Sequence, residues 1–246
     1  MPEIMLDLIG AISLGAVSLV VVLAYLYFPR WRSGQRAAVA AGLLAWFALV
    51  MAVGATGVLD AASGIGPAGL GIAVMLPFAL LSYLGMRPGS ARDALAATPL
   101  PALIGVHAIR LLGVFFVLLF HDGRLPAPFA PAAGWGDILI GATALPVAYL
   151  AATRAPGRRY VTLAWSTLGL FDLANAIALG AASSPGMPFG LGTPSVNSGL
   201  MTTLPWILIP CFNVPLLAHL HVLVFRRLWR SPAAGEPGRT VPPAVA

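Results

Sequence analysis

The sequence predicts an all-α polytopic membrane protein in which seven transmembrane helices form a single bundle. The chain of 246 residues is 59% hydrophobic and only 9% charged, unlike a soluble domain of this length. Long apolar runs recur along the whole chain, each of about 17 to 25 residues, the length that crosses about 30 Å of hydrocarbon. Arginine-rich loops alternate with loops that hold almost no arginine, which is the pattern of a polytopic membrane protein.

The seven expected helices follow one another with short connections. They cover residues 4–28, 37–59, 67–86, 102–121, 137–153, 161–181 and 200–225. The first run lacks the basic start and the cleavage site of a signal peptide, so we expect it to stay in the mature protein. Pro99 and Pro101 open the fourth helix, whereas Pro205, Pro210 and Pro215 predict a kinked or broken seventh helix, because each internal proline removes a backbone hydrogen bond.

No connecting loop is long enough for a separate soluble domain, so residues 1–230 are expected to form one bundle. Residues 231–246 are rich in proline, alanine and glycine and have no apolar face, so we expect a disordered tail. Glycine and alanine recur within the runs and would let helices pack closely in lipid.

The arginines predict the orientation of the chain. Of the 14 basic residues, all but Arg110 and Arg124 fall after the first, third, fifth or seventh run. Because cytoplasmic loops carry the excess of arginine, the N-terminus is expected outside and the C-terminus, with its tail, in the cytoplasm. The expected location is a bacterial inner (cytoplasmic) membrane, with the lipid bilayer as the main partner.

Composition excludes several classes of function. The net charge of +6 comes from arginines in short loops rather than from a basic face, so a nucleic-acid partner is not expected. Cys211 is the only cysteine, which excludes an intramolecular disulfide and a CxxC site. The chain has no lysine, so a Schiff-base retinal pigment is excluded despite the seven helices.

A charged residue in the fourth run predicts a polar centre. Arg110 lies near the middle of this run, and a guanidinium at that depth costs at least about 3 kcal/mol unless it faces protein or water. Asp172, in the sixth run, lies at a similar depth and is the expected partner. Asn175, Asn213 and His107 are expected to supply further hydrogen bonds, so these five residues form the predicted ligand-binding centre between helices four, six and seven.

Two histidines suggest a different kind of site. His107 and His219 each lie about six residues, or ~9 Å, from the cytoplasmic ends of their helices and could be the axial ligands of a b-type haem. His221 lies on another face and is expected at the membrane interface. Asp122 and Asp137 are expected to belong to the outer loops, and without recognisable ligand spacing they are read as solvated carboxylates, not as a metal site.

Three functions remain open at this point. The favoured one is the binding or translocation of a small solute or a proton through the polar centre. The second is a non-catalytic structural or accessory subunit of a larger membrane complex, or a homo-oligomer, in which the ion pair only fixes helix positions. The third is a b-type haem protein. An enzyme is less favoured, because the chain has no nucleophile elbow, HExxH, P-loop or paired catalytic carboxylates.

Overall fold

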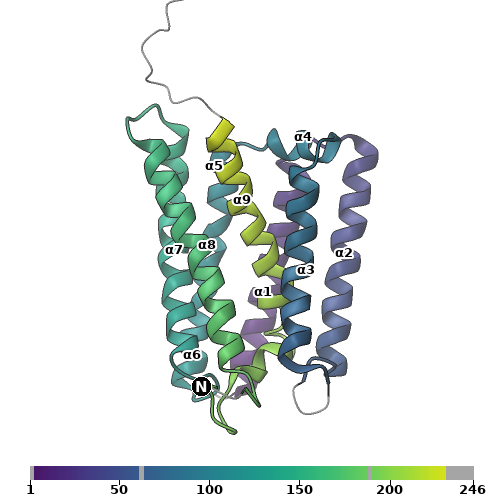
Figure 1. Ribbon diagram of the computed structural model, residues 1–246, viewed down its shortest axis with the longest axis vertical. Helices are drawn as coiled ribbons and strands as arrows, with labels where there is room; N and C mark the ends of the chain where they lie inside the picture. Colours follow the sequence, from purple (N-terminus) through teal and green to yellow (C-terminus); the bar gives the residue numbers. More distant parts are fainter. Residues whose placement is uncertain (1–2, 61–63, 188–189, 231–246) are drawn as a thin grey trace, which may run out of the picture.

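The computed structural model describes residues 3–60, 64–187 and 190–230 and is all-helical over these residues, with no strand among them. Seven of its helical segments are long and apolar enough to cross a membrane, as the sequence predicts. The N-terminus and the end of the last helix lie at opposite ends of the bundle (Figure 1). The tail predicted to be disordered lies outside the described residues.

Two of the spans are built from more than one helical segment. The elements are α1 (Glu3–Tyr27), α2 (Ser33–Thr56), α3 (Gly66–Met86), α4 (Ser90–Ala96), α5 (Leu100–Gly105), η1 (Val106–Gly113), α6 (Val114–His121), α7 (Phe129–Ala152), α8 (Arg158–Ala182), η2 (Ser198–Thr202), η3 (Ile209–Asn213) and α9 (Val214–Arg230). The consecutive segments α5, η1 and α6 make up the fourth span, and η3 with α9 makes up the seventh.

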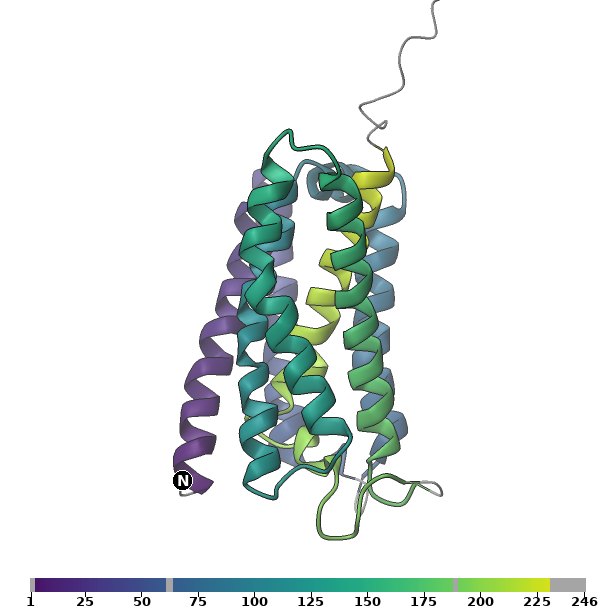
Figure 2. The ribbon, with the colours of Figure 1, turned by 90° about the vertical axis from the view of Figure 1, so that its left-hand side faces the viewer.

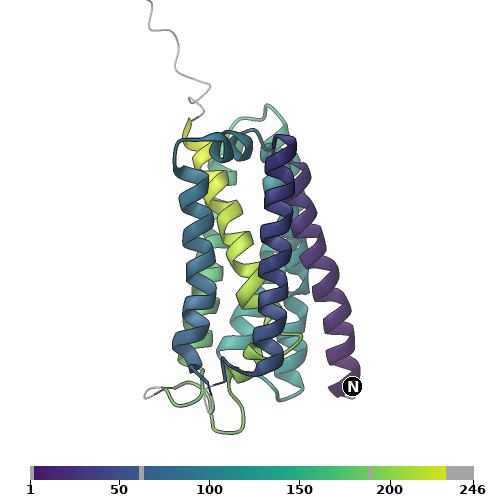
Figure 3. The ribbon, with the colours of Figure 1, turned by 90° about the vertical axis from the view of Figure 1, so that its right-hand side faces the viewer.

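The last span is the centre of the bundle. Of its most apolar stretch, 67% is buried, against 11% for the second span, so α9 lies inside and α2 at the periphery. α9 packs against α3, α5 and α8, and α7 packs against α8 and the fourth span. Figure 2 shows α7 and α8 side by side, and Figure 3 shows α2 and α3 with α9 visible between them. The short helix α4, in the connection between the third and fourth spans, lies across one end of the bundle (Figure 1).

The fifth span begins earlier than the sequence predicts. α7 starts at Phe129 rather than at Asp137, so residues 129–136, which were expected in a loop, are helical. Pro128 precedes the helix, and Pro131 lies in its first turn. The backbone N–H groups of the first turn have no acceptor within the helix, so proline, which lacks this group, is tolerated there. Asp137 is therefore about two turns inside the helix instead of in an outer loop.

The seventh span also differs from its predicted limits. A 3₁₀ turn, η2, and a further turn precede a π-helical segment, η3, and α9 then continues to Arg230 instead of ending at residue 225. Pro210 lies in the first turn of η3 and has no backbone N–H to donate to a preceding carbonyl. The side-chain Nδ2 of Asn213 donates to the carbonyl of Leu208 at 3.1 Å.

The middle of the fourth span is a 3₁₀ helix, which the apolar pattern does not predict. Residues three apart eclipse one another in a 3₁₀ helix, so His107, Arg110 and Gly113 line one face, and all three are buried. α7 approaches this face closely: a Cβ on Gly134 would lie 2.9 Å from the Gly113 carbonyl oxygen, and one on Gly141 would lie 2.5 Å from the backbone of the fourth span. This contact brings Arg110 next to α7.

Candidate functional site

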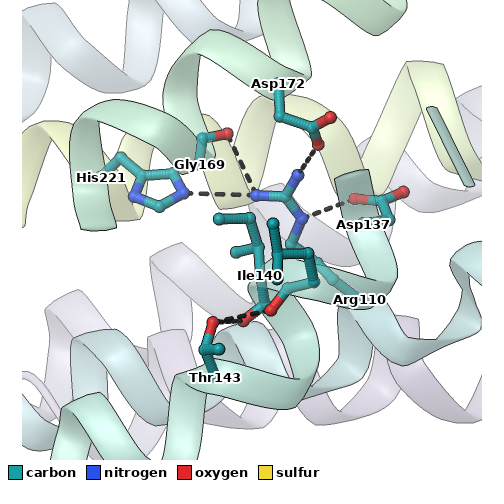
Figure 4. Close-up of polar contacts among 8 residues, drawn as sticks. Arg110, Asp137, Ile140, Thr143, Gly169, Asp172 and His221 are labelled. Carbon is teal, nitrogen blue, oxygen red and sulfur yellow. Dashed lines mark hydrogen bonds and ion pairs between the residues drawn. The ribbon is translucent and has the colours of Figure 1, made fainter. Parts of the chain in front are cut away.

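The guanidinium of Arg110 is buried, with its side chain only 1% exposed, and has partners on three neighbouring helices (Figure 4). Its Nε donates to Asp137 Oδ1 at 2.5 Å, and its Nη2 forms an ion pair with Asp172 Oδ2. Its Nη1 donates to the Gly169 carbonyl at 3.1 Å and lies 3.5 Å from His221 Nε2. We call Arg110, Asp137, Gly169, Asp172 and His221 the Arg110 cluster.

Four spans supply the Arg110 cluster. Arg110 comes from η1, Asp137 from α7, Gly169 and Asp172 from α8, and His221 from α9. Gly169 and Asp172 lie on the same face of α8, because residues three apart in an α-helix are neighbours on its surface. The guanidinium therefore joins four helices at one point.

Two glycines make room for these contacts. A Cβ on Gly136 of α7 would lie 1.7 Å from Asp172 Oδ1, so any larger residue would displace this carboxylate. A Cβ on Gly169 would lie 2.5 Å from Cε1 of the His221 ring and 3.3 Å from Arg110 Nη1. The carboxylate and the imidazole thus pack directly on helix backbone, and both positions require glycine.

The charges of the cluster do not cancel when both acids are ionised. One guanidinium faces two carboxylates, and the side chains of Asp137 and Asp172 are only 17% and 14% exposed. An excess charge in a low-dielectric interior is costly, so a bound proton or another cation is needed to balance it. The cluster therefore has the composition of a site that takes up a positive charge.

A histidine pair extends the cluster along the bundle. Ser166 Oγ lies 2.9 Å from His221 Nδ1. Since an arginine nitrogen can only donate, His221 Nε2 is the acceptor towards Arg110, and its Nδ1–H donates to Ser166. The ring of His107 lies over that of His221, with centroids 4.0 Å apart, and Trp165 packs edge-on against His107. His107 is fully buried, and neither of its ring nitrogens has a hydrogen-bond partner.

A small cavity opens beside the guanidinium. Its volume is about 40 Å³, and its polar lining comes from Arg110, Asp137 and Asn213. The rest of its wall is apolar and includes Leu14 and Leu217. A cavity of this size with several polar groups has room for a few water molecules but not for an organic solute.

Comparison with known proteins places this site within a family. The model of a family described as Domain of unknown function (DUF8737) matches residues 67–229, which is more than half of the chain. The chain belongs to this family. The DUF8737 match runs from α3 to α9 and contains every residue of the Arg110 cluster, whereas α1 and α2 lie before it. A search of curated proteins and a search of solved structures each found no match.

Two residues of the Arg110 cluster differ from the sequence-based expectation. His221 is fully buried instead of interfacial, because α9 continues for more than two turns beyond it. Asp137 binds Arg110 instead of lying in a solvated outer loop, because α7 begins before it. The signal that could have found Asp137 is the glycine pattern GWGDILIG, which predicts close helix contact around the acid.

The remaining predicted site residues lie around the cluster. Arg110 and Asp172 form an ion pair. His107 contacts His221, which in turn contacts Arg110. Asn213 lines the cavity and donates a hydrogen bond from Nδ2 to the Ser18 hydroxyl of α1 at 3.1 Å. Within the part of the chain that the structure describes, Asn175 is half-buried and forms no hydrogen bond with the cluster.

The two histidines considered as haem ligands are not brought together. His219 and His221 are two residues apart on α9 and therefore face nearly opposite sides of it. His219 Nδ1 lies 2.8 Å from the Tyr25 hydroxyl of α1, and its Nε2 points to Gly85 of α3, whereas the His107 ring packs against His221. Within residues 3–60, 64–187 and 190–230, no three His, Cys, Asp or Glu side chains are grouped as metal ligands.

Proposed function

We propose that this protein is an integral membrane protein that binds a proton at the Arg110 cluster and passes it across the membrane, alone or coupled to a small solute. The observation that carries the proposal is the pairing of one buried guanidinium with two carboxylates on different helices. When both carboxylates are ionised, the site holds one negative charge in excess, which a proton neutralises with the smallest possible volume.

The neighbourhood of the cluster supports a proton rather than a larger ligand. The cavity at Arg110 holds only a few waters, and water and histidine are the usual carriers in a proton path. His221 already connects Ser166 with the guanidinium. The His107 ring packs against His221, and both of its nitrogens lack a hydrogen-bond partner. His107, His221 and the guanidinium form a buried row of polar groups that leads to Asp137 and Asp172. A proton relay through a membrane protein needs such a row.

We propose the orientation with the N-terminus outside and the C-terminus in the cytoplasm of a bacterial inner membrane. The loops after α1, after α3 and after α7 lie at the same end of the bundle as the end of α9. Most of the arginines lie at this end, either in these loops or in the helix turns next to them. The opposite end holds Asp7, Asp122 and a single arginine, Arg124. This distribution supports the cytoplasmic assignment of the arginine-rich end.

The proposal is tested by proton flux into proteoliposomes that contain the purified full-length protein and an internal pH-sensitive dye. An imposed membrane potential should drive flux through the wild type, and Asp137→Asn or Asp172→Asn should reduce it to the level of empty liposomes. The matched control is Asp7→Asn, which removes a carboxylate from another ion pair, with Arg124, at one end of the bundle. This control should retain wild-type flux.

The competing function is an architectural one, in which the protein is a subunit of a larger membrane complex and the cluster only holds helices together. It is favoured by the fact that every terminal nitrogen of the Arg110 guanidinium already has a partner. In that case the wild type shows no flux above empty liposomes. Stoichiometric co-purification of other membrane proteins with the native chain would then support the subunit role.

A further inference from the structure

One amide side chain lies on the lipid-facing side of a span. It belongs to Asn175 of α8, the helix that forms one side of the bundle together with α7 (Figure 2). Asn175 follows Phe171 by four residues and precedes Ala178 by three, so the three residues share one face of the helix. The other exposed residues of this face are Ala164, Thr167, Leu168 and Ala174. We call these seven residues the Asn175 face.

The position of Asn175 along α8 places its amide in the hydrocarbon layer. α8 runs from Arg158 to Ala182 and is long and apolar enough to cross a membrane. Its 25 residues span about 37 Å, only a few Å more at each end than the hydrocarbon layer. Asn175 lies about 10 Å before the end of the helix at Ala182. Because the Cα–Cβ bonds of a helix tilt toward its N-terminus, the side chain points away from this end and deeper into the membrane.

The amide of Asn175 lacks a partner within its own chain. An asparagine side chain offers two N–H donors and one carbonyl oxygen. Among the residues that the structure describes, none forms a hydrogen bond with Asn175. Thr167 on the same face differs, because its hydroxyl donates to the carbonyl of Leu163 at 3.0 Å. Lipid tails form no hydrogen bonds, so an amide at this depth is stabilised by a polar group from another molecule.

We propose that the Asn175 face binds a second copy of this chain, and that the two Asn175 amides hydrogen-bond to each other. Two copies inserted in the same direction carry Asn175 at the same depth, and a twofold axis along the membrane normal brings the same residue of each copy together. An amide is self-complementary, since the N–H group of one donates to the carbonyl oxygen of the other. A different protein would need a polar group at this depth, whereas a second copy has one by symmetry.

The surroundings of Asn175 suit contact between two helices. Ala174 and Ala178 lie next to it, and small residues let helix backbones approach closely in lipid. Leu168 and Phe171 are 58% and 68% exposed and supply apolar surface for packing beside the amide. The Asn175 face holds no charged residue, so two copies meet without repulsion. The proposal goes beyond the function of the Arg110 cluster and does not depend on it.

The first test measures dimer formation of the full-length protein in liposomes, by energy transfer between donor-labelled and acceptor-labelled copies at a series of protein-to-lipid ratios. We expect the wild type to dimerise. Asn175→Ala should weaken the dimer about tenfold, the effect expected for two hydrogen bonds between membrane helices. Asn175→Gln keeps an amide and should retain the dimer. The matched control is Thr167→Val, which removes a hydroxyl that its own helix already satisfies and should behave like the wild type.

The second test locates the contact by cysteine cross-linking. Cys211 is the only cysteine of the chain and is buried, so Cys211→Ser provides a background without cysteine. On this background, Ala178→Cys should form a disulfide between two copies when membranes are treated with copper phenanthroline, which gives a product of twice the mass of the chain. Ala45→Cys is the control, because Ala45 is exposed on the peripheral helix α2, and it should give no such product.

Four results would overturn the proposal. One is a wild type that stays monomeric at every protein-to-lipid ratio, which would leave the amide to lipid or water. Another is an Asn175→Ala variant that dimerises as tightly as the wild type. A third is a cross-linked dimer of Ala45→Cys but not of Ala178→Cys, which would move the contact to α2. The last is an Ala178→Cys product whose mass shows a different protein, which would replace the second copy by another subunit.

Discussion

Replacement of Arg110 by methionine is the perturbation that most directly tests how the bundle is held together. Methionine is an unbranched side chain of roughly similar length to arginine, but it carries no charge. The variant therefore leaves Asp137 and Asp172 without their common partner. Breaking a buried ion pair by removal of one partner typically costs about 3–5 kcal/mol, because a charge stays buried without compensation. The carbonyl of Gly169 also loses its donor from Arg110. We therefore expect a loss of about 3–5 kcal/mol in the free energy of unfolding.

The measurement is unfolding of purified full-length protein in one detergent, with Arg124→Met as the matched control. Arg124 pairs with Asp7 at 2.9 Å, with side chains that are 15% and 37% exposed, so water screens this pair more than the Arg110 cluster and we expect a smaller loss, about 1 kcal/mol. Arg110→Met should therefore be far less stable than Arg124→Met. Equal stability of the two variants would refute the reasoning, because the buried cluster would then contribute no more than a surface ion pair.

A triple variant separates unpaired charge from lost packing. Arg110→Met combined with Asp137→Asn and Asp172→Asn has no charge left at the site, and buried ion pairs can often be replaced by neutral groups at little cost. The triple variant should recover most of the stability that Arg110→Met loses. If it were as unstable as the single variant, the shape of the arginine side chain, and not its charge, would hold the helices.

Three other predictions follow from named contacts. Gly169→Ala should cost about 1–3 kcal/mol because its methyl group meets the His221 ring, whereas Gly71→Ala, where nothing lies within 4 Å, should be neutral or slightly stabilising in the same unfolding assay. Visible spectra of the purified protein should lack a Soret band, since His107 and His219 face different helices; a Soret band lost in both His→Ala variants would contradict this. Fusions at the C-terminus should give fluorescent green fluorescent protein and inactive alkaline phosphatase, and the opposite pair of results would reverse the proposed orientation.

The spans could be predicted from the sequence because the bilayer imposes one length on every apolar run. The depth of Arg110 and Asp172 could also be predicted, since position along a membrane helix follows from the count of residues from its end. The structure places these two residues in contact. Tertiary contacts were needed for the rest: Asp137 was assigned to a loop because proline at the start of α7 resembles a loop in the sequence.

The directions in which side chains point were harder to predict. The last span is apolar on all faces, so no hydrophobic stripe in the sequence marks the side that faces each adjacent helix. The helices that His219 and His221 contact could therefore not be predicted. The 3₁₀ winding of η1 was equally hidden, because no helix-breaking residue within it marks the change from an α-helix. This winding aligns His107 with Arg110, since residues three apart share a face of a 3₁₀ helix.

Infrared spectroscopy of the purified protein at neutral pH tests the central claim, that the Arg110 cluster holds a proton, most directly. The carbonyl stretching band of a protonated carboxylic acid lies at a different infrared frequency from the bands of an ionised carboxylate. The wild type should show such a band, and Asp137→Asn or Asp172→Asn should abolish it, because the single remaining carboxylate is then balanced by the guanidinium. Asp7→Asn should leave it unchanged. A wild type without a protonated-carboxyl band, or with one that survives both cluster variants, would contradict the claim.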